Sequence, residues 1–304
     1  MGNCTLFNLR KSYTTMNQQP LLLVVCAVLI ISLFNTDNFF KSRAYGHDFI
    51  PDESASFLSF ANQLKTESEL VQSNLANGNV DLAKEHAIGA IELLNSTDPI
   101  NNVLWKDEIA ERNQRVANDL VRAVLNLESI TMSSSLSEQQ QQSILNDTTQ
   151  LTDEIDAIIE DAITSRIDSD QRGNATIQAT TLGDIINNIL RYYGNAYAVG
   201  IDMANMSEMA SMMGDNSSNK NHTLVDTADY QSAQALATKA IEIFNSELRS
   251  SNGNVTSPIA KLEDGLTQLN NSIKNKASPM DVTIIGHTQV HPNLQAAFNL
   301  QMKV

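Results

Sequence analysis

The residues of this chain with the most distinctive chemistry are its methionines. Five of the ten methionines fall within 11 residues, at Met203, Met206, Met209, Met212 and Met213. Thioether sulfur is a soft, neutral ligand of the kind that selects Cu(I). We therefore treat Met203, Met206, Met209 and Met213 as candidate copper ligands. The same cluster also fits two other roles, filling an irregular gap in a core and lining a partner-binding face.

Two of the five histidines form a second candidate metal site. His287 and His291 are four residues apart, so in an extended chain their side chains project from the same face. His47 lies in another segment that we expect to be extended, and the three imidazoles could meet in a copper or zinc site. The alternative is that these histidines are isolated, because a spacing of four is not specific by itself.

Other catalytic or nucleotide-binding patterns are missing from the sequence. It contains no Gly-x-Ser-x-Gly, no P-loop, no Gly-x-Gly-x-x-Gly and no His-Glu-x-x-His. Cys4 and Cys26 are the only cysteines, so a disulfide or a thiolate metal site is not expected beyond the N-terminus. The acidic residues between Asp153 and Asp161 are typical of a solvated helix face. We therefore expect a protein that is not an enzyme and binds no nucleotide.

The composition favours an acidic, all-α protein. The 304 residues include 20 Lys and Arg against 35 Asp and Glu, which gives a formal net charge of −15. Such a charge opposes binding to phosphate backbones, so we exclude nucleic acid as a partner. With only 12 Gly, 6 Pro and 42% apolar residues, the chain favours long helices around a sizeable core.

The N-terminus predicts attachment to a membrane. Residues 21–34 form an uncharged apolar run that follows Arg10 and Lys11, with no acidic residue before it. The positive-inside rule then places the bulk of the chain outside the cytoplasm, as a single-pass protein of the cell membrane. Because the run is short for a span, the alternative is a signal peptide cleaved near Ala44, which would make the protein secreted.

Eight Asn-x-Ser/Thr sequons agree with export, since N-glycans are added outside the cytoplasm. Sequons also arise by chance in a chain rich in Asn, Ser and Thr. The candidate glycosylation sites are Asn95, Asn146, Asn174, Asn205, Asn216, Asn221, Asn254 and Asn270.

Hydrophobic periodicity predicts about seven helices, paired as antiparallel hairpins in a bundle. We expect them over residues 52–76, 80–94, 103–132, 137–167, 175–213, 227–250 and 257–276. Residues 279–291 are rich in β-branched side chains and lack a helical period, so they predict an extended strap. The expected division is a cytoplasmic segment (1–20), a signal anchor or signal-peptide segment (21–40), an extended linker (41–51), an extracytoplasmic helical domain (52–278) and a C-terminal strap with a short terminal helix (279–304).

The hairpin over residues 75–94 resembles a single tetratricopeptide unit, with Gly78 at the turn and Ala83 and Ala90 at small contact positions. The tandem 34-residue period is absent, so the resemblance implies no peptide-binding groove. The hairpin is also similar to the extracytoplasmic helical domains attached to bacterial iron permeases. Neither position three residues from His86 is a glutamate, so no iron ligand is carried over.

Two functions fit these observations. The first is a non-catalytic, membrane-anchored helical module that binds protein partners in the cell envelope or serves as an accessory subunit there. The second is an extracytoplasmic copper-handling protein that uses the methionine cluster or the C-terminal histidines. The first depends on the anchor, the predicted helices and the absence of a catalytic motif.

Overall fold

Four long helices begin the described part of the chain. In this computed structural model the described residues are 52–132, 138–205, 223–249 and 257–301. The four helices are α2 (Glu53–Ala76), α3 (Val80–Leu94), α4 (Trp105–Met132) and α5 (Glu138–Arg166). Local chemistry sets their ends. Asp52 caps α2, since its Oδ1 accepts the amide of Ala55 at 2.9 Å. Gly78, with φ of +75°, turns the chain from α2 into α3.

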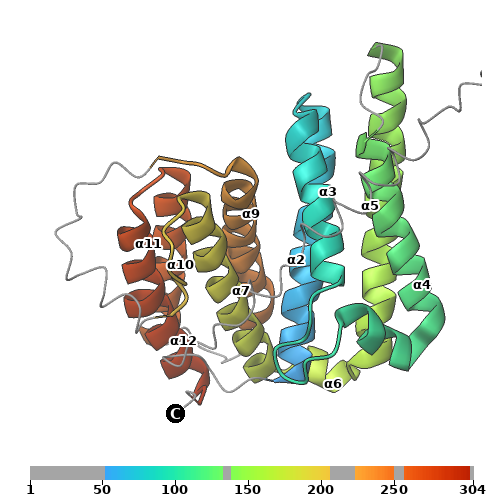
Figure 1. Cartoon of the computed structure of the whole chain (residues 1–304). Helices are drawn as coiled ribbons and strands as arrows, with labels where there is room; N and C mark the ends of the chain where they lie inside the picture. The colour runs from blue at the N-terminus through green and yellow to red at the C-terminus, as the bar shows by residue number, and fades with distance from the viewer. Residues whose placement is uncertain (1–51, 133–137, 206–222, 250–256, 302–304) are drawn as a thin grey trace, which may run out of the picture. The chain divides into compact units, whose positions relative to one another are not determined.

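These four helices enclose one hydrophobic core. Figure 1 shows α2 beside α3 and α4 beside α5, and α2 also packs against α5 and α3 against α4. The rings of Phe60 and Trp105 stack with centroids 4.8 Å apart, and Phe57 contacts both. The guanidinium of Arg166 covers the Phe57 ring at 4.9 Å. Each large apolar side chain buried here stabilises the fold by about 1.5–3 kcal/mol.

The remaining helices surround a second core, except the single turn α6, which buries no side chain. They are α6 (Ser169–Arg172), α7 (Ala175–Ala196), α9 (Thr227–Ile243), the π-helical turn η1 (Phe244–Leu248), α10 (Ser257–Lys274), α11 (Pro279–Ile285), the π-helical turn η2 (Gly286–Val290) and α12 (His291–Phe298). Helix α7 packs against α9, α9 against α10, and α10 against α12. Tyr193 is fully buried in this core and donates its hydroxyl hydrogen to the Ala277 carbonyl at 2.7 Å.

Helix α2 joins the two groups of helices. It contacts α7 and α9 as well as α3 and α5, and α3 also contacts α9. Hydrogen bonds cross this junction: Thr181 donates to the Ala55 carbonyl at 3.3 Å, and Asn188 donates to the Ser59 hydroxyl at 3.4 Å. The buried apolar residues therefore form two separate clusters, with polar contacts between them.

The all-α prediction is confirmed for the described residues, which contain no strand. The expected number of about seven helices is too low, because α6 and α11 lie in segments predicted to be non-helical. The helix predicted over residues 175–213 is too long, since α7 ends at Ala196. Ala198 is left-handed, with φ of +49°, and the Val199 amide donates to the Gly194 carbonyl at 3.0 Å. This arrangement satisfies a carbonyl at the helix end and stops the helix there.

The prediction of an extended strap over residues 279–291 is wrong, because residues 279–298 are helical. Ser278 Oγ accepts the Asp281 amide at 3.1 Å, and Pro279 occupies the first turn, so both residues favour a helix start. Val282 is fully buried, and Gly286 packs so closely on Leu190 that a Cβ would lie 3.1 Å from its Cδ1. Burial against α7 and α10 therefore outweighs the strand preference of the β-branched residues. The short terminal helix is confirmed as α12.

The predicted signal anchor at residues 21–40 lies outside the described residues, as do residues 1–20 and the linker at 41–51. Among the helices that are described, none combines the length and the apolarity that a membrane span requires.

Candidate functional site

The two C-terminal histidines do come together, on a helix instead of on a strap. His287 lies in η2 and His291 begins α12, and both side chains are buried. Their ring centroids are 5.3 Å apart and the rings are nearly perpendicular. His287 Nε2 donates to the carbonyl oxygen of Met203 at 3.0 Å. One methionine of the predicted cluster therefore contacts the histidine pair, through its main chain.

The side chain of Met203 behaves as a core residue. It is 1% exposed and packs over Gly194, where a Cβ would lie 3.0 Å from the Met203 sulfur. The other candidate ligands Met206, Met209 and Met213 lie outside the described residues, as does His47. Within the described ranges no three His, Cys, Asp or Glu side chains gather as a metal would need. Copper binding therefore stays a prediction.

The described sequons differ in exposure. Asn95, Asn146 and Asn174 are exposed, although Asn174 uses its side chain to cap α7. Asn205 and Asn270 are buried, which argues against a glycan on either side chain because a glycan needs solvent. Asn216, Asn221 and Asn254 lie outside the described residues.

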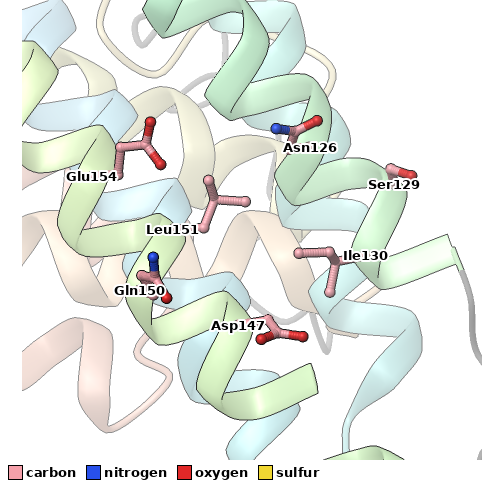
Figure 2. Close-up of a pocket in the computed structure, with 7 residues that line it drawn as sticks. All are labelled: Asn126, Ser129, Ile130, Asp147, Gln150, Leu151 and Glu154. Carbon is pink, nitrogen blue, oxygen red and sulfur yellow. The ribbon is translucent and has the colours of Figure 1, made fainter. Parts of the chain in front are cut away.

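A pocket lies between the C-terminal part of α4 and the N-terminal half of α5 (Figure 2). Ile130 and Leu151 point into the space between the helices and form its apolar part. The other lining residues are polar: Asn126 and Ser129 from α4, and Asp147, Gln150 and Glu154 from α5. We refer to these seven residues as the α4–α5 groove. It continues the seam of the first core, where Leu127 and Ile155 are fully buried.

Two exposed apolar side chains lie on α4 next to Ser129 at the rim of the α4–α5 groove, about 140–160° around the helix from Ile130. Leu125 is 47% exposed and Met132 is 49% exposed, and few other large apolar residues in the described ranges are as open to solvent. Both share a helix face with Ser129, because residues three and four apart are neighbours on a helix. An apolar stripe beside a groove with an apolar floor is the composition of a binding surface.

The charges in the α4–α5 groove are all negative. Its two ionisable residues, Asp147 and Glu154, are exposed and have no ion-pair partner among the described residues. The nearest turn of α4 carries Arg122, which is bonded to Asp119 at 2.9 Å. The groove therefore presents apolar surface between two uncompensated carboxylates.

A buried polar network lies at the junction of α2, α3 and α9. His86 Nδ1 lies 2.7 Å from Glu67 Oε2, and His86 Nε2 lies 2.8 Å from Gln231 Oε1. Ser232 donates to Glu67 Oε1 at 2.7 Å. Gly89 gives the carboxylate room, since a Cβ there would lie 3.3 Å from Glu67 Oε2. Burial lowers the pKa of His86, but its hydrogen bond and charge interaction with Glu67 outweigh burial, and the pKa is raised.

This network is not arranged for nucleophilic catalysis. A serine nucleophile needs an imidazole within hydrogen-bond reach to take its proton. Ser232 instead bonds to the carboxylate, and both nitrogens of His86 are occupied by other oxygens. Glu67 and His86 are also almost completely buried. The geometry is that of an ion pair that fastens helices together.

A second buried ion pair lies at the N-terminal end of α4, away from the α4–α5 groove. Arg166 Nη2 lies 2.8 Å from Glu108 Oε2, and Asn101 donates to the same carboxylate. Burial raises the pKa of Glu108 to about 6, against the lowering effect of Asn101 and Arg166. Because Arg166 also covers Phe57, this pair closes the edge of the first core.

Sequence reasoning missed both the groove and the network. Local motifs pair His86 only with residues three positions away, whereas its partners in the structure, Glu67 and Gln231, are 19 and 145 positions away. One feature of the sequence pointed to this surface: Leu125 and Met132 are apolar but lie outside the helical seam that passes through the buried Leu120 and Leu127.

Comparison with known proteins adds no relative to this picture. The chain matches no protein-family model, no curated protein and no solved structure.

Proposed function

We propose that this chain is a non-catalytic interaction module of the cell envelope, anchored to the membrane through residues 21–40, which binds a partner protein at the α4–α5 groove. The observation that carries this proposal is the apolar groove floor of Ile130 and Leu151 beside the exposed stripe of Leu125 and Met132. Leu125 and Met132 lie on one face of α4, so they offer a partner two apolar contacts next to the groove.

The chemistry of the described residues supports a binding role over a catalytic one. The groove is lined by carboxylates, amides, a hydroxyl and aliphatic groups, with no imidazole or thiol among its lining residues. The network of Glu67 and His86 is buried from solvent. Ser232 donates to the Glu67 carboxylate and not to an imidazole that could take its proton.

Photo-crosslinking tests this proposal. A photoreactive amino acid replaces Asn126 or Gln150 in the full chain, and cells of the source organism that express it are irradiated. We expect a discrete adduct with another protein, which Leu125→Ser plus Met132→Ser reduces at least fivefold because the apolar stripe is removed. Ile88→Ser plus Val225→Ser is the matched control, since these two residues are also large, apolar and exposed.

Two outcomes would contradict the proposal. In the first, no adduct forms at either groove position. In the second, both pairs of substitutions reduce the adduct equally, which would mean that exposed apolar surface in general, and not the α4–α5 groove, holds the partner.

A further inference from the structure

We infer that the occupant of the α4–α5 groove is an amphipathic helix with a basic edge, an inference that rests on the proposed binding function. The groove runs between two neighbouring helices, and its floor is formed by one apolar residue from each, Ile130 and Leu151. A third helix fits such a furrow by placing apolar residues at i, i+3 or i+4 and i+7 along it.

The length of the α4–α5 groove agrees with a helical ligand. Asp147, Leu151 and Glu154 lie on one face of α5 and span seven positions, which is about 10 Å or two helical turns. On α4, the stripe of Leu125, Ser129 and Met132 covers the same number of positions. Two turns of a ligand helix can therefore contact Ile130 and Leu151 at the floor and reach the Leu125 and Met132 side chains beyond the Ser129 rim.

The negative charges of the groove favour a positively charged ligand. Asp147 and Glu154 stand at the two ends of the α5 side, and the described residues offer neither of them a cation. Lysines or arginines seven positions apart on a ligand helix would meet both carboxylates. A second copy of this chain is a poor occupant, because its net charge of −15 would bring like charges together. An anionic lipid surface is disfavoured for the same reason.

Synthetic helices provide the test. Three dye-labelled peptides of about five turns share an alanine framework with leucines at i, i+4 and i+7. The first has lysines along one edge of the leucine stripe, the second has glutamates there, and the third has the lysines and two central prolines that break the helix. Their affinities for the full chain, held in zwitterionic lipid nanodiscs, are measured by fluorescence anisotropy.

We expect the lysine helix to bind at least tenfold more tightly than the glutamate helix and the proline-broken peptide. Asp147→Asn plus Glu154→Gln should weaken the lysine helix about fivefold, which corresponds to two exposed ion pairs, and should reduce the dependence of its affinity on salt. Asp107→Asn plus Glu111→Gln is the matched control. These two exposed residues of the same types lie at the far end of α4, so their substitution should change the affinity less than twofold.

The outcomes separate this inference from the proposed function. If the glutamate helix binds as tightly as the lysine helix, or if both pairs of charge substitutions weaken binding equally, the basic ligand is wrong. The proposed function then still stands provided that Leu125→Ser plus Met132→Ser abolishes binding. Self-association of the chain, or binding to vesicles of anionic lipid, that depends on Leu125 and Met132 would also overturn the inference. If no peptide depends on this stripe, the inference fails, and the cross-linking experiment decides the proposed function independently.

Discussion

The protonation state of His86 follows from its neighbours. Both ring nitrogens face oxygen acceptors, one on Glu67 and one on Gln231. The Gln231 amide is held in place by Asn74, which donates to Gln231 Oε1 at 2.8 Å and accepts from its Nε2 at 3.2 Å. With this assignment of the amides, Nε2 donates its hydrogen to Gln231, and a second hydrogen lies between Nδ1 and the Glu67 carboxyl. The raised pKa of His86 favours the imidazolium, paired with Glu67, in the buried junction of α2, α3 and α9.

Removing one charge of this pair should destabilise the fold. We expect Glu67→Gln to lower the free energy of unfolding by about 3 kcal/mol, because it leaves a buried imidazolium without its counter-ion. Glu111→Gln makes the same change at an exposed position of α4 and should cost less than about 0.5 kcal/mol. Urea denaturation of the full chain measures both values. Equal effects of the two substitutions would show that the pair contributes no specific stabilisation.

At the scale of helices, local chemistry explains where the elements begin and end. Asp52, Asn174, Asp226 and Ser278 each use a side-chain oxygen to accept an amide in the first turn of a helix. Each such cap satisfies a donor that the helix itself leaves free. Most helix boundaries could therefore be predicted from the sequence, and the error in α7 arises at a left-handed alanine, which has no sequence signature.

The backbone conformation at Gly78, in the turn between α2 and α3, should by itself require a glycine. Gly78 has φ of +75°, and a Cβ added there would have no atom within 4 Å, so Gly78→Ala should cost about 1 kcal/mol through backbone strain and not through a clash. Gly173 provides the control, because its φ is −86° and a Cβ there makes only an ordinary contact. Gly173→Ala should be neutral or stabilising by a few tenths of a kcal/mol. Thermal unfolding followed by circular dichroism compares them, and a neutral Gly78→Ala would contradict the assigned turn.

At the scale of the whole molecule, two buried groups and one half-buried group make stability depend on pH in the same direction. Burial, followed by the nearby charges of Asp226 and Glu67, raises the pKa of Asp229 to about 7. Burial raises the pKa of Glu108 to about 6, and Glu67 raises that of His86. In each case the folded protein holds its proton to a higher pH than the unfolded chain. Stability must therefore fall as pH rises, through the pH range in which these groups titrate.

The melting temperature should accordingly decrease from pH 5 to pH 8. Asp229 and Glu108 contribute to this decrease from about pH 4 up to their raised pKa values, and His86 contributes above about pH 6.5, the pKa of an unfolded histidine. Asp229→Asn should reduce the slope and stabilise the protein at pH 8 by about 1–2 kcal/mol. This is less than the full pKa shift implies, since solvent screens a partly buried group. Asp153→Asn, at an exposed position, should leave the slope unchanged. A melting temperature that rises with pH would contradict the assignment of these groups.

The helical class, the acidic character and most helix boundaries of this protein could be predicted from its sequence alone. Periodicity, capping residues and turn glycines act over a few positions, so they are visible without the fold. The contact of His86 with Glu67 and Gln231, the helical course of residues 279–298 and the opening of the α4–α5 seam were decided by tertiary structure. Each depends on which helix faces reach one another across 19 to 145 positions of chain, and burial at those faces overrides the local preferences that a sequence displays.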